Sequence, residues 1–99
     1  MKKLPKGFRR YDSAEYLKTE EDMAAYLDAC FAEGGDDPAF IARALGTIAR
    51  ARGMTQLARD TGISREGLYK ALSGEGNPEF ATILKVMHAL GIQLRAVGA

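Results

Sequence analysis

The polar side chains best suited to chemistry in this chain gather in residues 54–73, which have the pattern of two short helices joined by a turn. Gly62 marks the turn, because glycine adopts a positive φ readily, and Ser64 is a suitable N-cap for the second helix. Leu68 and Ala71 would face inward along that helix. The side chains left on its outer face form a donor-rich surface in which Glu66 is an acceptor: Ser64, Arg65, Glu66, Tyr69, Lys70 and Ser73.

This outer face predicts a helix-turn-helix unit whose second helix enters the major groove of double-stranded DNA. Arg65, at the start of that helix, is the candidate for a bidentate contact with guanine. Tyr69 and Lys70 lie one turn further on and would contact a thymine methyl group and a phosphate, respectively. Other polar side chains suit phosphate contacts, namely Gln56 and Ser64 near helix N-termini and, if exposed, Arg43, Arg50 and Arg59.

Little in the sequence favours catalysis. Cys30 and His88 are the single cysteine and the single histidine, and neither has a partner at metal-ligand spacing. We therefore expect no metal and no cofactor, and we expect Cys30 to pack in the core. A helix cap explains the adjacent carboxylates Asp36 and Asp37, and without a nucleophile–base pair we do not expect an enzyme.

Composition favours one small domain that folds in a reducing compartment. The chain has 99 residues, of which 46% are hydrophobic and 27% are charged, as in ordinary globular domains. A single cysteine allows no internal disulfide. We find no signal peptide, and no apolar run approaches the roughly 18 residues that cross a bilayer. We therefore expect a cytoplasmic protein with no membrane partner.

The net charge of +1 conceals segments of opposite sign. Residues 1–10 carry five basic residues and no acid, and residues 11–37 carry nine acids and one base. Residues 38–74, which contain the helix-turn-helix pattern, carry six bases and two acids. This partition predicts two kinds of partner surface, although each segment could also be a solvated face.

The elements that position these residues begin after an irregular N-terminal arm, residues 1–18, in which proline and glycine discourage a helix. We expect a single helical domain over residues 19–99. Its first helix, 20–33, would be capped by Thr19 and bury an apolar stripe of Met23, Tyr26, Leu27, Cys30 and Phe31. Its second helix would start with Asp37 as cap, carry Pro38 in its first turn and end at Gly53.

The C-terminal quarter predicts a last helix and a short strand. The helix would start near Asn77 and Pro78 and bury Phe80, Ile83, Leu84, Met87 and Leu90. Residues 92–97 alternate apolar and polar side chains, which is typical of a strand. Because a lone strand is unstable, this one would pair with another chain or lie flat on the helices.

Several stretches resemble the addiction-module antidote (antitoxin) proteins of the XRE, HigA-like helix-turn-helix class. The resemblance covers about residues 8–97 and is carried by Tyr11-Asp12, Ala14–Leu17, Ala44–Gly46, Ala49–Met54, Ser64–Ser73 and Gly76–Pro78. It implies an all-α, five-helix, phage-repressor-like (lambda-repressor-like) DNA-binding fold, here with the N-terminal extension and the C-terminal strand. It also implies DNA contacts for Ser64, Arg65, Glu66, Tyr69 and Lys70.

The resemblance further implies that the chain neutralises a toxin of the RelE/HigB-like ribonuclease type and represses its own operon. A ribonuclease carries a basic RNA-binding face, which the acidic segment 11–37 could cover. Candidate charges for this contact are Glu15, Glu20, Glu21, Asp28 and Glu33, and candidate apolar anchors are Tyr16, Leu17 and Phe31.

Specific DNA binding normally takes two helix-turn-helix units about 34 Å apart, so we expect a homodimer. The last helix and residues 92–97 are candidates for its interface. Two alternatives remain open for the function. One is a plain phage-type transcriptional repressor without a toxin partner, and the other is a protein-interaction module whose helix-turn-helix is vestigial.

Overall fold

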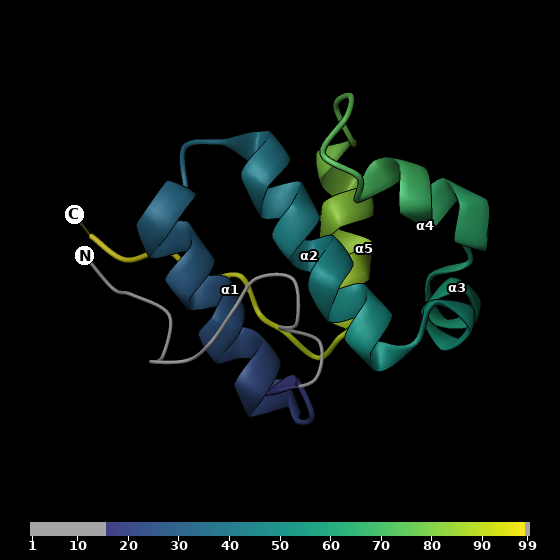
Figure 1. Ribbon diagram of the computed structural model, residues 1–99, viewed down its shortest axis with the longest axis horizontal. Coiled ribbons are helices and arrows are strands. Elements are labelled where there is room, and N and C mark those ends of the chain that lie inside the picture. Colours follow the sequence, from purple (N-terminus) through teal and green to yellow (C-terminus); the bar gives the residue numbers. More distant parts are fainter. Residues whose placement is uncertain (1–15, 99) are drawn as a thin grey trace.

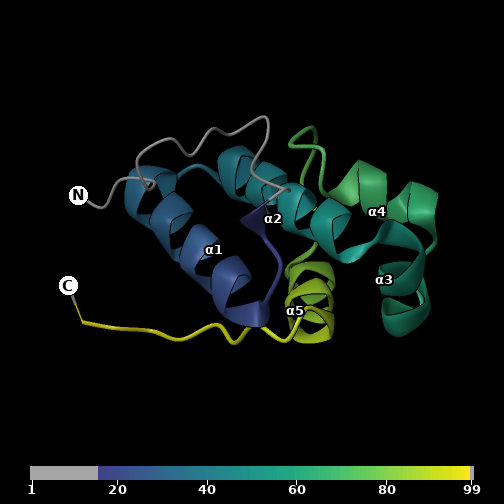
Figure 2. The same ribbon diagram turned by 60° about the horizontal axis from the view of Figure 1, so that its bottom comes forward.

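Five α-helices follow one another in the computed structural model, which describes residues 16–98 (Figure 1). They are α1 (Glu20–Gly34), α2 (Pro38–Arg52), α3 (Met54–Thr61), α4 (Arg65–Ala71) and α5 (Phe80–Ala89). Helix α1 lies beside α2 at one end of the molecule, α3 and α4 lie at the other end, and α5 lies between them (Figures 1 and 2). The described part of the chain is therefore all-α, as the sequence predicts.

Local hydrogen bonds fix the starts of the first two helices at the predicted residues. The Thr19 hydroxyl accepts from the backbone N–H of Asp22 at 3.0 Å, and the Asp22 carboxylate accepts from the backbone N–H of Thr19 at 3.1 Å. This is a complete capping box. At α2, the Asp37 carboxylate accepts from the backbone N–H groups of Ala39 and Phe40, at 3.0 and 3.3 Å, and Pro38 occupies the first turn.

The core is centred on α2, in which seven of the 15 residues are buried. Leu45 and Ile48 of this helix are fully buried in an apolar cluster that includes side chains from all five helices. Cys30 on α1 belongs to the same cluster and is 1% exposed, so its predicted place in the core is confirmed. One continuous apolar cluster therefore holds all five helices together.

Gly46 allows α2 to approach the end of α4 closely. A Cβ atom on Gly46 would lie 2.8 Å from the backbone oxygen of Leu72, which is the C-cap of α4. In proteins, Cβ atoms essentially never lie within 3.0 Å of a non-bonded heavy atom. The lack of a side chain at this position therefore helps to set where α4 sits.

Two predictions for the C-terminal quarter are wrong. Helix α5 begins at Phe80 after the N-cap Glu79, not near Asn77-Pro78. Ile83, Met87 and Leu90 lie on its buried side as predicted, together with Val86. Because these four positions already make a stripe at helical spacing, Phe80 and Leu84 are left 65% and 41% exposed.

The predicted strand over residues 92–97 is also absent, because none of residues 16–98 forms a strand. The segment after α5 is held at its start, where the Ile92 N–H donates to the Met87 oxygen at 2.9 Å and the Ile92 side chain is buried. It then runs along the α1 end of the molecule (Figure 2). An extended segment becomes a strand only with a pairing partner, and the described residues provide none.

The described part of the chain also bears on two other expectations. None of its helices is long and apolar enough to cross a membrane. The predicted irregular arm, residues 1–18, falls almost entirely outside residues 16–98.

Candidate nucleic-acid interface on α4

The turn between α3 and α4 has the geometry that the sequence predicts. Gly62 has a φ of +74°, in the left-handed region that glycine favours, and its N–H donates to the Ala58 oxygen at 2.9 Å. The Thr61 hydroxyl donates to the Leu57 oxygen at 2.8 Å and accepts from the Ile63 N–H at 3.2 Å. The direction in which the chain enters α4 is therefore fixed by hydrogen bonds on both sides of Gly62.

Helix α4 is capped at its start and anchored along one side. The Ser64 hydroxyl accepts from the backbone N–H of Gly67 at 3.0 Å, which confirms Ser64 as the N-cap. Leu68 is fully buried and Leu72 is 3% exposed, so these two side chains set the rotation of the helix. Gly67 leaves room for the turn, because a Cβ there would lie 3.1 Å from both Ile63 Cγ2 and the Ser64 hydroxyl oxygen.

Every residue of the predicted DNA-binding set is exposed, and for those on α4 this follows from the rotation of the helix: Gln56, Ser64, Arg65, Glu66, Tyr69, Lys70 and Ser73. Within residues 16–98, the side chains of Arg65, Tyr69 and Lys70 make no hydrogen bond or ion pair. Tyr69 is 45% exposed although its ring is large and mostly apolar. We call the exposed side chains of Arg65, Glu66, Tyr69 and Lys70 the outer face of α4. It combines three donors with one acceptor.

Three other members of the predicted DNA-binding set make hydrogen bonds to nearby residues. The Gln56 amide donates to the Asp60 carboxylate at 2.9 Å, which places an acid beside a predicted phosphate contact. The Ser73 hydroxyl donates to the Lys70 oxygen at 3.0 Å and accepts from the Glu75 N–H at 3.1 Å. Ser64 accepts through its hydroxyl oxygen as the cap, so its hydroxyl proton is still available to donate.

A cleft beside the C-terminal end of α4 gathers further positive charge. It encloses about 310 Å³ and is lined by Tyr26, Arg43, Ala44, Thr47, Arg50, Leu72 and Ser73, none of them acidic. Arg43, Thr47 and Arg50 recur at the spacing of one helix face. The Arg50 guanidinium donates to the Thr47 hydroxyl at 3.3 Å, and this hydroxyl donates to the Arg43 oxygen at 3.2 Å. We call this feature the cationic cleft.

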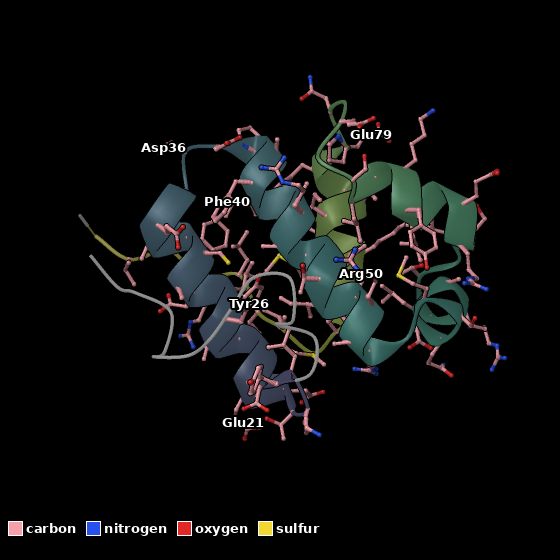
Figure 3. All side chains as sticks on the ribbon, viewed as in Figure 1. Glu21, Tyr26, Asp36, Phe40, Arg50 and Glu79 are labelled. Atoms are coloured by element: carbon pink, nitrogen blue, oxygen red, sulfur yellow. The ribbon has the colours of Figure 1, made fainter. Side chains whose placement is uncertain are left out.

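Figure 3 places Arg50 of α2 and Tyr26 of α1 on the same side of the molecule. The sequence identified Arg43 and Arg50 as separate candidates for phosphate contacts. It did not reveal that they share a cleft with Ser73, because that depends on where the end of α4 packs against α2. Their seven-residue spacing, two helical turns, is the one signal that could have paired them.

The predicted toxin-binding set is divided by the structure. Glu20, Glu21 and Asp28 are exposed along α1, and Tyr16 and Phe31 are 51% and 39% exposed. Leu17 is only 4% exposed and belongs to the core, so its expected role as a surface anchor is wrong. Glu15 lies outside the described residues.

The described residues hold no obvious centre for metal chemistry. Across residues 16–98, no three side chains of histidine, cysteine, aspartate or glutamate gather in a way that could hold a metal ion.

Comparison with known proteins assigns the family. The model of a family described as "Probable addiction module antidote protein" matches residues 7–98, which include all five helices. The chain belongs to this antidote family. An uncharacterized protein of Haemophilus influenzae is 58% identical over 92 residues, which cover 93% of each chain. No solved structure matches the antidote. Membership in an antidote family implies, in general terms, a toxin as a partner.

Proposed function

We propose that this antidote binds double-stranded DNA with the outer face of α4, represses its own operon, and neutralises a RelE/HigB-like ribonuclease toxin in the cytoplasm. The observation that carries the DNA-binding part is the outer face itself. Arg65, Tyr69 and Lys70 are exposed and unengaged by residues 16–98, on a helix whose other side is locked into the core. A rigid helix with free donors on one face suits base contacts in the major groove.

The cationic cleft supports this proposal, because it adds charge next to the same helix. Phosphate contacts supply much of the affinity of a DNA-binding protein and fix its register, whereas contacts to base edges specify the sequence. Arg43 and Arg50 line the cleft together with Ser73, two residues beyond the end of α4. We propose that the cleft receives a backbone phosphate while Arg65 contacts a guanine.

Arg65→Ala is the direct test of the base contact. A bidentate arginine–guanine pair contributes about 1–3 kcal/mol of discrimination, so affinity for the antidote's own promoter should fall by about 5- to 150-fold. Fluorescence anisotropy with a labelled promoter duplex, and with a scrambled duplex of equal length, measures both affinity and specificity.

The control is Lys18→Ala, which removes one positive charge from an exposed residue just before α1, at the other end of the molecule from α4. It should change promoter affinity little. The proposal is wrong if the wild type binds the promoter and the scrambled duplex equally, or if Arg65→Ala binds as tightly as Lys18→Ala.

The toxin-binding part of the proposal rests on the family and on the charge of α1. This helix carries acids throughout and no basic residue, and Glu20, Glu21 and Asp28 are exposed on it. Such a surface complements the basic face that a ribonuclease needs for RNA. Changing these three residues to lysine should weaken neutralisation of the toxin in a translation assay, and unchanged neutralisation would exclude α1 from the contact.

We also propose that the fold is of the phage-repressor (lambda-repressor-like) type and that two chains act together on DNA. A homodimer would present two α4 helices to one face of the duplex. Light scattering at high protein concentration tests this directly, and a monomer mass under those conditions would contradict it. The family assignment favours the antidote over a plain repressor, because an antidote requires a toxin. The promoter titrations separate this proposal from a protein-interaction module whose helix-turn-helix is vestigial.

A further inference from the structure

An apolar groove lies on the side of α2 that faces away from the cationic cleft. It encloses about 360 Å³, and its walls come from α1, α2, α5 and the segments around α5, notably Phe31, Ile41, Pro78, Phe80, Ile83 and Leu94. Ile41 and Leu45 of α2 line the groove, whereas Arg43, Thr47 and Arg50 line the cleft. At about 100° per residue, these two sets point to opposite sides of the helix.

The groove is an open surface with large side chains at its edge. Phe80, Leu94 and Phe31 are 65%, 49% and 39% exposed, although an apolar side chain of this size usually lies in the core. Exposed apolar patches of this kind mark sites of interaction with another molecule.

The charge at the groove is acidic. Among the described residues that line it, Asp36 is the single charged one. Helix α1, which forms one wall, carries five acids and no base. The last turn of α1 has no basic residue to offset the partial negative charge at its C-terminal end, which is next to Asp36.

This charge pattern decides between two possible occupants. A second copy of the chain docking symmetrically in the same groove would set Asp36 and the C-terminal end of α1 against the same groups of its partner. Like charges that face each other across an interface disfavour such a dimer. A segment that carries basic residues beside apolar ones satisfies both the acidic rim and the apolar floor.

We infer that the groove binds a cationic, apolar segment of the toxin, with apolar side chains against Phe31, Phe80 and Ile83 and basic side chains near Asp36. This inference rests on the proposed function, since it supposes that the chain binds a basic toxin. Of the described residues that line the groove, none belongs to α3 or α4. Toxin and DNA therefore occupy separate surfaces, and one antidote can hold both.

Phe80→Ala tests the apolar contact at the edge of the groove. Because Phe80 is largely exposed, its truncation should leave the melting temperature almost unchanged. Affinity for the toxin should nevertheless fall by at least about tenfold, as for an aromatic residue at the centre of an interface. The matched control is Leu84→Ala, an exposed apolar residue of the same helix that does not line the groove.

Asp36→Lys tests the acidic rim, with Glu75→Lys as a charge-matched control in the exposed loop before α5. Reversal at Asp36 should weaken binding and reduce its dependence on salt, whereas reversal at Glu75 should change neither. The ligand in all titrations is the protein encoded by the reading frame adjacent to the antidote gene, purified in catalytically inactive form. Calorimetry gives the affinity, and promoter anisotropy on the same preparations reports DNA binding.

The inference is supported if Phe80→Ala and Asp36→Lys lose toxin affinity, the two controls keep it, and all four variants bind promoter DNA like the wild type. It is overturned if the wild type binds the toxin and all four variants bind equally well. It is also overturned if Phe80→Ala converts a dimer into a monomer, because a second copy then occupies the groove. If the wild type itself does not bind the toxin, the proposed neutralisation is wrong and the groove inference fails with it.

Discussion

Gly46→Ala is the substitution that most directly links packing to the position of α4. The new Cβ would lie 2.8 Å from the backbone oxygen of Leu72, which cannot rotate away as a side chain could. Either α2 or the C-terminal end of α4 must therefore move. A shift of α4 also moves its outer face, so this change should weaken promoter binding. The new Cβ would also lie 3.4 Å from a guanidinium nitrogen of Arg50, which is an ordinary van der Waals contact, so the main effect is expected from the displaced helix.

The expected size of the effect follows from two opposing contributions. Overpacking in a filled core costs about 1–3 kcal/mol. Replacing glycine by alanine inside a helix returns about 0.5–1 kcal/mol, because alanine loses less conformational entropy on folding. The net loss should be about 1 kcal/mol, which lowers the melting temperature of a domain of this size by about 4–8 °C.

Gly67→Ala is the matched control, because it places the same methyl group on the other helix of this contact. There the Cβ would lie 3.1 Å from two side-chain atoms, Ile63 Cγ2 and the Ser64 hydroxyl oxygen, so a displacement of a few tenths of an ångström relieves the contact and no backbone atom stands in the way. Thermal denaturation followed by circular dichroism should therefore rank Gly46→Ala below Gly67→Ala. The reasoning is refuted if Gly46→Ala melts above the wild type.

Two further predictions concern single side chains of the site. Ser64→Ala removes the cap of α4 and should cost about 1 kcal/mol in a urea denaturation series; an unchanged midpoint would mean that the cap contributes nothing. Arg43→Ala should lower the slope of log affinity against log salt concentration by about 1 in promoter titrations, because one phosphate contact is lost. A slope equal to that of the wild type would remove Arg43 from the phosphate-binding set.

The parts of the fold that could be predicted from the sequence are those set by local interactions. Thr19, Asp37 and Ser64 were identifiable as caps because each side chain bonds to a backbone N–H two or three residues away. Gly62 was identifiable because a left-handed turn between two helices favours glycine. Local chemistry of this kind does not depend on the rest of the chain.

The errors arose where distant segments decide the outcome. The apolar residues of α5 fit more than one helical stripe, and packing against the other helices selected the one that leaves Phe80 exposed. Alternation in residues 92–97 predicted a strand, but a strand also needs a partner. The alternating pattern shows that the segment suits a strand, but it says nothing about a partner strand.

In the candidate site, too, local features could be predicted from the sequence and long-range contacts could not. The rotation of α4 could be predicted, because burying Leu68 leaves Arg65 and Tyr69 outside. The roles of Gly46 and of the groove could not, since they depend on segments 26 to 63 residues apart, such as Leu72 against Gly46 and Leu94 against Phe31. The sequence contains these residues but gives no sign of their proximity.

The central claim is that the outer face of α4 meets DNA, and backbone amide shifts in a two-dimensional NMR titration with the promoter duplex test it most directly. The account predicts that the largest shifts fall in residues 64–73 and around Arg43 and Arg50, while the amides of α1 and of the apolar groove stay nearly in place. Shifts centred on α1, or no saturable shifts in α4, would contradict it.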